Sequence, residues 1–245
     1  MSNTLIIIPS RMSATRLPGK PLLKINGLSI ISHVVKKAKE TEIGEVIVAT
    51  ENKEILDDVK QNKGEAIFTS KANKTGTDRI WEAYKKLNYK DVDFIINLQG
   101  DEPLIDPDDI KNLDKMVKDN SSEIGTLATT LESEKNLINE NIVKVKTKDY
   151  LKDNNSSLAE NFFRKINNNH TNLYHHIGIY EYEISCLEKF SQLKQTENEI
   201  KNRLEQLRAL DNNINIDVIL AKSKVLGVDT MEDYIELKKI MEYKS

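Results

Sequence analysis

Three positively charged side chains fall within one short segment near the start of the chain: Arg11, Arg16 and Lys20. They follow a run of leucine and isoleucine residues at positions 5–8, which predicts a buried first strand. Open α/β sheets bind ligands at the loops that leave the carboxyl ends of their strands. Three fixed cations at such a place suit a polyanion, since charge-assisted hydrogen bonds to phosphate oxygens are strong. We therefore expect residues 6–23 to form a triphosphate-binding loop.

Two familiar phosphate-binding signatures do not occur in this sequence. It contains neither the dinucleotide-binding pattern G-x-G-x-x-G nor the P-loop pattern G-x-x-x-x-G-K-[ST]. Hydride transfer and ordinary ATPase chemistry are therefore unsupported. The alternative interpretation of Arg11 and Arg16 is that they are solvated loop charges, which is the commoner role of a lone arginine.

A second chemically informative segment follows an apolar run at residues 94–98. It reads Gln-Gly-Asp-Glu-Pro at residues 99–103. A partly desolvated carboxylate at the end of a central strand needs a partner. Mg²⁺ binds one or two carboxylates together with substrate phosphates and water, so Asp101 is the first candidate metal ligand. The alternative is an ordinary turn in which Asp101 caps a backbone N–H.

Strands and helices alternate through the first half of the chain, which is the arrangement needed to bring these two loops together. Apolar runs predict strands at residues 5–8, 45–50, 66–68 and 94–98, and helical spacing of apolar residues predicts helices at 29–39, near 55–64 and up to 87. Thr77 or Asp78 is the expected N-cap of the third helix. This order predicts an α/β fold: a Rossmann-like mixed, mainly parallel sheet flanked by helices.

The second half of the chain has a different pattern. After a strand at 124–131, the residues up to about 182 lack regular helices, so we expect a β-rich excursion at approximately 132–185 within a single domain, 1–245. Ile200, Leu204, Leu207 and Leu210 predict one amphipathic helix at 197–210. A strand at 214–220 and a final helix follow, and Asp229 is a possible N-cap of that helix.

The composition limits the classes of partner. A net charge of −3 with 31% charged residues gives no overall basic field, so neither nucleic acid nor a membrane is an expected partner. The single cysteine, Cys186, can form neither an internal disulfide nor a zinc cluster. No segment has the pattern of a secretion signal or the length of a membrane span. We expect a cytoplasmic protein.

Motifs spread along nearly the whole chain resemble those of the sugar-activating nucleotidyltransferases, in the branch that joins CMP to acidic sugars. The nearest likeness is to the 3-deoxy-manno-octulosonate (Kdo) cytidylyltransferases. The basic loop ends in Leu-Pro-Gly-Lys-Pro-Leu, and Gln-Gly-Asp-Glu-Pro follows the fourth strand. The remaining motifs are Gly-Thr-Asp-Arg at 76–79, His-Ile-Gly-Ile-Tyr at 176–180, Leu-Glu-Gln-Leu-Arg at 204–208 and Gly-Val-Asp-Thr at 227–230. The chain departs from the family pattern at Ser10, Ala14, Phe163 and Asn202.

This resemblance implies roles for particular residues. It makes Asp101 and Asp229 a pair of magnesium ligands, and with Arg11 and Lys20 they form the expected catalytic set. The expected nucleotide-binding residues are Pro9, Ser10, Arg11, Arg16, Lys20, Gln99 and Gly100. The expected sugar-binding residues are Arg79, Arg164, His176, Glu205 and Gln206.

The resemblance also implies a reaction. CMP would pass from CTP to the anomeric hydroxyl of Kdo in the presence of Mg²⁺, giving CMP-Kdo and pyrophosphate for lipopolysaccharide synthesis. The β-rich excursion would carry sugar contacts and the contacts of a homodimer. Two alternatives stay open. One is transfer to another acidic sugar, such as 8-amino-Kdo or a sialate-like sugar, and the other is a noncatalytic nucleotide-sugar binding protein.

Overall fold

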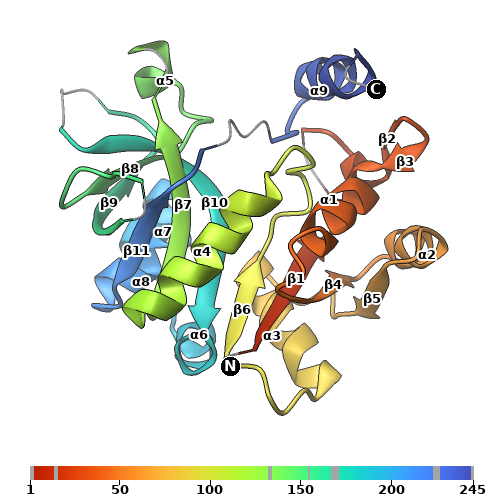
Figure 1. Ribbon diagram of the computed structural model, residues 1–245, viewed down its shortest axis with the longest axis horizontal. Coiled ribbons are helices and arrows are strands. Elements are labelled where there is room, and N and C mark those ends of the chain that lie inside the picture. The colour runs from red at the N-terminus through yellow and green to blue at the C-terminus, as the bar shows by residue number, and fades with distance from the viewer. Residues whose placement is uncertain are drawn as a thin grey trace. The chain divides into compact units, whose positions relative to one another are not determined.

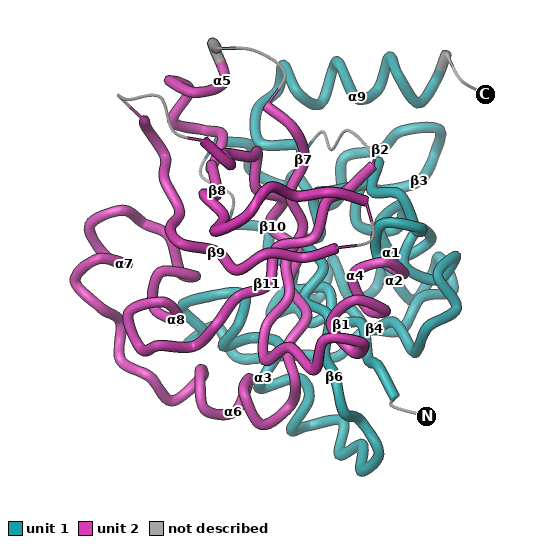
Figure 2. Tube along the Cα trace, turned by 60° about the vertical axis from the view of Figure 1, so that its left-hand side comes forward, with its two compact units in different colours: residues 1–110, 225–245 teal, residues 111–224 magenta. Residues whose placement is uncertain are grey.

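The structure is a computed structural model that describes residues 3–13, 16–131, 134–153, 155–166, 171–222 and 227–243. The chain divides into two compact units, which Figure 2 distinguishes by colour. Unit 1 contains residues 1–110 and 225–245, and unit 2 contains residues 111–224. The expected excursion at 132–185 falls within unit 2.

Unit 1 is built on a parallel sheet whose strands stand in the order β5-β4-β1-β6 (Figure 1). These strands are β1 (Thr4–Ser10), β4 (Gly44–Thr50), β5 (Glu65–Phe68) and β6 (Phe94–Asn97). The order confirms the predicted fold class. The chain moves from β1 outward through β4 and β5, then returns to place β6 on the other side of β1. The carboxyl ends of β1 and β6 therefore meet at a topological switch point, where ligands bind in open α/β sheets.

Three helices pack against this sheet: α1 (Ile30–Lys39), α2 (Lys53–Gln61) and α3 (Gly76–Leu87). The helix predicted at 29–39 is confirmed. Ser29 is its N-cap, and the Ser29 side chain accepts a hydrogen bond from the Ser32 N–H at 3.2 Å. Its buried residues recur at helical spacing, and the lysines at 36, 37 and 39 lie in its last turn. A short 3₁₀ helix, η1 (Lys20–Leu22), and the two-stranded β2 (Lys24–Ile25) and β3 (Leu28–Ser29) connect β1 to α1.

Unit 2 contains a ring of five strands. They are β7 (Ile124–Thr130), β8 (Lys144–Thr147), β9 (Ser156–Phe163), β10 (Leu173–Glu183) and β11 (Ile216–Leu220). Strand β10 pairs with both β7 and β8, and β9 and β11 complete the circuit between them.

Helix α4 (Pro107–Asn120) begins at the end of the first segment of unit 1 and continues into unit 2. The other helices of unit 2 are α5 (Glu134–Ile138), α6 (Ile184–Gln192), α7 (Glu197–Asn202) and α8 (Leu207–Asp211). The single helix predicted at 197–210 is wrong. The chain forms two helices because Arg203 adopts the left-handed conformation with φ of 54° and ends α7. Ile200, expected on the buried face, is 59% exposed, and Glu199 faces inward instead.

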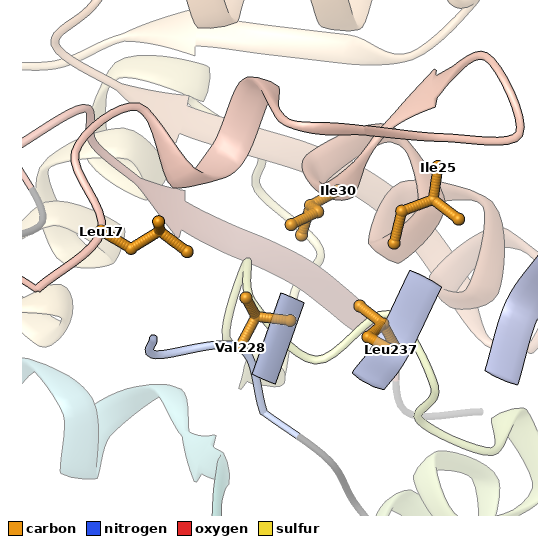
Figure 3. Packing of buried hydrophobic residues seen from close by; sticks show 5 residues of the cluster. All are labelled: Leu17, Ile25, Ile30, Val228 and Leu237. Atoms are coloured by element: carbon orange, nitrogen blue, oxygen red, sulfur yellow. The ribbon is translucent and has the colours of Figure 1, made fainter. Parts of the chain in front are cut away.

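The C-terminal helix, α9 (Met231–Tyr243), belongs to unit 1. Its Leu237 joins a buried cluster with residues from the loop after β1 and from α1 (Figure 3). The helices of the described residues include none with the length and apolar character required to cross a bilayer.

Candidate functional site

The loop after β1 turns sharply before it delivers its lysine. Gly19 has φ of 74°, a left-handed conformation that glycine adopts without the steric cost of a side chain. Its N–H donates to the Met12 carbonyl at 3.3 Å, and the Lys20 N–H donates to the Leu17 carbonyl at 3.2 Å. These two hydrogen bonds close a turn at Gly19. The Lys20 side chain then lies at the carboxyl edge of the sheet and is largely buried.

A cavity of about 390 Å³ opens at this edge of unit 1. Every expected nucleotide-binding residue lines it, as do Asp101, Asp229 and Arg79. Arg11 is exposed and makes no ion pair with any residue that the structure describes, so its guanidinium is available to an anion. Lys74 and Thr75 also line the cavity, although the sequence analysis did not select them. Their position in the loop between β5 and α3, at the same sheet edge, was the signal available.

The Lys20 ammonium lies between two carboxylates. Its Nζ is 2.6 Å from Asp101 Oδ2 and 3.2 Å from Asp229 Oδ1. Arg16 adds a second cation, 2.8 Å from Asp229 Oδ2. Burial lowers the pKa of Lys20, but the attraction and hydrogen bonds of the two carboxylates outweigh burial and raise it above its ordinary value. Two carboxylates from segments 128 positions apart in numbering thus converge on one point.

Asp229 reaches this point through backbone and apolar contacts. The Val228 N–H donates to the Asp101 carbonyl at 3.0 Å, which joins the two acidic segments directly. Figure 3 shows Val228 and Leu237 pointing toward Leu17, Ile25 and Ile30. Burial of these side chains fixes the C-terminal segment against the loop after β1. Lys20 and Asp229 are far apart in the sequence, so long-range packing and not local sequence brings them together.

The N-cap alternative for Asp229 is wrong. Helix α9 begins at Met231, and the Asp233 N–H donates to the hydroxyl of Thr230 at 3.2 Å. The Asp233 carboxylate accepts in return from the Thr230 N–H at 2.8 Å. Because Thr230 and Asp233 cap the helix, the Asp229 carboxylate is left to face Lys20 and Arg16.

Glu102 lies behind the acidic pair. Its Oε2 is buried and has no hydrogen-bond partner among the described residues. Burial, followed by repulsion from Asp101 and Asp229, holds the pKa of Glu102 well above its usual range. This shift favours the neutral form of Glu102 beside the two aspartates.

Arg79 is buried beside the cavity and is held by two side chains. Its guanidinium donates to the Thr69 hydroxyl at 2.7 Å and forms an ion pair with Glu51. Glu51 was not among the expected site residues, and its position directly after β4 at the carboxyl edge was the only signal for it. The expected N-cap, Thr77 or Asp78, is wrong in part: Thr75 caps α3, and Asp78 reciprocates from the third helical position.

The remaining expected sugar-binding residues lie in unit 2. Arg164 follows β9, and its guanidinium donates to three backbone carbonyls: Asn202 at 3.1 Å, Glu140 at 3.2 Å and Arg203 at 3.0 Å. The observed contacts of Arg164 are therefore with the main chain of its own unit.

His176 lies on β10 and is almost completely buried. Its Nε2 is 3.0 Å from the Thr126 hydroxyl, and its ring meets that of Phe162 edge to face at 5.0 Å. Burial, reinforced by His175, lowers the pKa of His176 to about 3, so the ring is neutral at pH 7. Tyr180, which the sequence analysis did not single out, lies next to this ring at 5.4 Å.

Glu205 and Gln206 stand between α7 and α8. Arg208 joins these helices: its Nε and Nη2 donate to the Glu199 carboxylate at 2.7 and 2.6 Å, and its guanidinium lies over the Phe190 ring at 4.8 Å. Arg208 Nη2 is also 3.5 Å from Glu205 Oε1. Burial, then Tyr182 and Glu205, raise the pKa of Tyr180 well above its ordinary value.

The residues at the cavity edge fit a hard divalent cation. No group of three or more histidine, cysteine, aspartate or glutamate side chains in the described ranges is arranged to hold a metal by itself. Mg²⁺ does not require one, because it takes one or two carboxylates and completes its octahedron with phosphate oxygens and water. Asp101 and Asp229 offer two carboxylates that already converge on a single cation, the Lys20 ammonium.

A family model described as cytidylyltransferase matches residues 5–217. The chain is 39% identical over 243 residues to the 3-deoxy-manno-octulosonate cytidylyltransferase of Nitrobacter hamburgensis, covering 98% of this chain and 93% of that protein. The chain belongs to this cytidylyltransferase family. It is an enzyme. The corresponding protein of Brucella anthropi is 40% identical over 233 residues, covering 94% of this chain and 93% of that protein.

Solved structures agree with this family membership. A CMP:2-keto-3-deoxy-manno-octonic acid synthetase in complex with CTP is 32% identical, has a TM-score of 0.89 and covers both chains completely. A UDP-glucose pyrophosphorylase has a TM-score of 0.75 at 17% identity, which shows a shared fold.

Proposed function

We propose that this enzyme transfers CMP from CTP to the anomeric hydroxyl of Kdo, releasing pyrophosphate. The observation that carries the proposal is the convergence of Lys20, Asp101 and Asp229 at the mouth of a cation-lined cavity. The names of the similar proteins support Kdo as acceptor, and the CTP bound in one of them supports the donor.

In this reaction the hydroxyl oxygen of the sugar attacks the α-phosphorus, and the bond from that phosphorus to the bridging oxygen of the β-phosphate breaks. Pyrophosphate leaves, and the hydroxyl proton passes to solvent. Arg11, Arg16 and Lys20 would bind the triphosphate and neutralise the charge that develops on the leaving group. Gln99 and Gly100, which line the same cavity, would contact the nucleotide. Catalysis of this kind depends mainly on positioning and on fixed charge.

The proposal includes Mg²⁺, which Asp101 and Asp229 would hold. The ion would supply a positive charge to the phosphate oxygens during transfer. In the free protein Lys20 neutralises the same two carboxylates. Phosphate binding would therefore offer the Lys20 ammonium a new anionic partner and release the pair for the metal.

The acceptor sugar would be recognised by Arg79, Arg164, His176, Glu205 and Gln206. A neutral His176 can both donate and accept hydrogen bonds, which suits a polyol. A Kdo carboxylate would need a cation, and Arg79 and Arg164 are the proposed partners. By analogy with the family, we further propose that the enzyme is a cytoplasmic homodimer and that its product serves lipopolysaccharide synthesis.

The decisive test is pyrophosphate release from CTP with Kdo, compared with 8-amino-Kdo, sialic acid and no sugar. Release with Kdo that requires Mg²⁺ is the expected result. Asp101→Asn should lower the rate at least a hundredfold, whereas Asp91→Asn, which changes an exposed loop carboxylate, should leave it unchanged. If pyrophosphate is released only with another of these acidic sugars, that sugar and not Kdo is the acceptor. CTP binding without release with any of these sugars would instead identify a noncatalytic nucleotide-binding protein.

A further inference from the structure

Lys144 on β8 is completely buried, which is rare for a lysine. Its Nζ donates to the Asn139 carbonyl at 2.6 Å and to the Arg164 carbonyl at 2.7 Å. Within the described residues, no carboxylate lies within ion-pair distance of this ammonium. Burial accordingly lowers the pKa of Lys144. Glu140 attracts this ammonium from beyond ion-pair distance, but the hydrogen bonds of the ammonium go to backbone carbonyls. A buried charge in this setting is costly, so its position in the fold calls for an explanation.

The two carbonyls bound by Lys144 belong to the segments that hold Arg164 in place. One is the carbonyl of Arg164 itself. The other is the carbonyl of Asn139, and the carbonyl of the next residue, Glu140, accepts a hydrogen bond from Arg164 Nη1. The Arg164 side chain continues from there to the carbonyls of Asn202 and Arg203. Arg164 thus connects the two: its carbonyl is bound by the Lys144 ammonium, and its side chain binds the end of α7.

The end of α7 is where the helix predicted from the sequence is interrupted. Arg203 takes a left-handed conformation there, and the carbonyls before it lose their helical partners. Arg164 donates to the carbonyl of Asn202, which lies before Arg203, and to the carbonyl of Arg203 itself. On the other side of the break, Arg208 fixes α8 to Glu199 of α7. Glu205 and Gln206 lie between these two arginine contacts.

We propose that Lys144 is a positioning residue for the acceptor sugar. Through Arg164 it fixes the break between α7 and α8, and thereby the direction in which Glu205 and Gln206 present their side chains. Lys144 itself cannot contact a ligand because none of its surface is exposed. This inference rests on the proposed function for the identity of the sugar, but its structural part concerns the segment 203–208 alone.

Lys144→Met keeps the length of the side chain and removes its donors. We expect the KM for Kdo to rise about tenfold, while the KM for CTP and the kcat at saturating Kdo stay within twofold. The matched control is Lys146→Met on the same strand, which removes an exposed ion pair with Glu160 and should change neither constant. If Lys144 were purely structural, Lys144→Met would lower the melting temperature but leave the kinetic constants measured below that temperature unchanged. This result would overturn the proposal.

Two further measurements keep the test decisive. Hydrogen exchange of the backbone amides at 203–208 should be at least tenfold faster in Lys144→Met than in Lys146→Met, and equal exchange would overturn the proposal even if Kdo proves not to be the acceptor. Arg164→Met should raise the KM for Kdo, and the double variant should be no worse than the more affected single variant. Independent, multiplying effects would refute the route through Arg164. If Lys144→Met does not fold, Lys144→Gln, which retains one donor group, takes its place in both measurements.

Discussion

Replacing Lys20 by methionine removes the only lysine contact shared by Asp101 and Asp229 in the described structure. The lysine side chain is 11% exposed, and those of the aspartates are 31% and 46% exposed. Methionine preserves the apolar stem, so the change isolates the ammonium. Two carboxylates would then face each other, and among the described residues only Arg16 would pair with one of them.

The expected loss of folding free energy follows from these exposures. The hydrogen bond to Asp101 is short and partly buried, and such a bond to a charged group contributes about 1.5–3 kcal/mol. The contact with Asp229 is half-exposed and contributes about 0–1 kcal/mol. We therefore expect Lys20→Met to lower the free energy of unfolding by about 1.5–4 kcal/mol.

Urea unfolding followed by circular dichroism measures this loss in the free protein. Lys24→Met is the matched control, because Lys24 is exposed four residues further on, and its effect should stay below about 0.5 kcal/mol. With the ammonium gone, Mg²⁺ without nucleotide should raise the melting temperature of Lys20→Met more than that of the wild type. Pyrophosphate release should fall by about 10²–10³-fold. An unfolding free energy equal to that of the wild type, together with no greater response to Mg²⁺, would refute the bridging arrangement.

Two other predictions concern unit 2. The pKa of Glu181 is raised to about 9, first by burial and then by Asp114, so the folded state keeps a proton that the unfolded state releases near pH 4.5. Stability should therefore fall as pH rises from about 4.5 to 9. Glu181→Gln should remove this decline and raise the melting temperature at pH 8–9 but not at pH 5; parallel melting curves against pH would contradict the assignment. At Gly125 an added Cβ would lie 2.2 Å from Val117 Cγ2, so Gly125→Ala should lower the free energy of unfolding by about 1–3 kcal/mol. Val117→Ala in the same chain should recover part of that loss, and strictly additive losses in urea unfolding would rule out the contact as its cause.

The elements of unit 1 could be predicted because local patterns specify them. The apolar run in β1 is buried as expected, and α1 begins at Ser29 with the predicted buried face. Two loops that follow parallel strands must reach the same edge of the sheet, so the proximity of Lys20 and Asp101 follows from strand order alone. Local pattern failed at residues 197–210, whose periodicity fits one helix. The chain forms two helices there, and two contacts stabilise the break: Arg164 binds the carbonyls at 202 and 203, and Arg208 pairs with Glu199.

The sequence by itself determined the α/β class, the basic loop and the acidic segment at one sheet edge, because periodicity and strand order are properties of neighbouring residues. Only the tertiary structure decided which charges meet. Asp229 joins Lys20 because Val228 and Leu237 bury their side chains against residues of the segment that follows β1. Arg79 is paired with Glu51, and Lys144 is buried against backbone carbonyls, for equally nonlocal reasons. A charged residue looks the same in a sequence whether it is solvated or buried, and burial, which only the folded chain provides, determines what its charge can do.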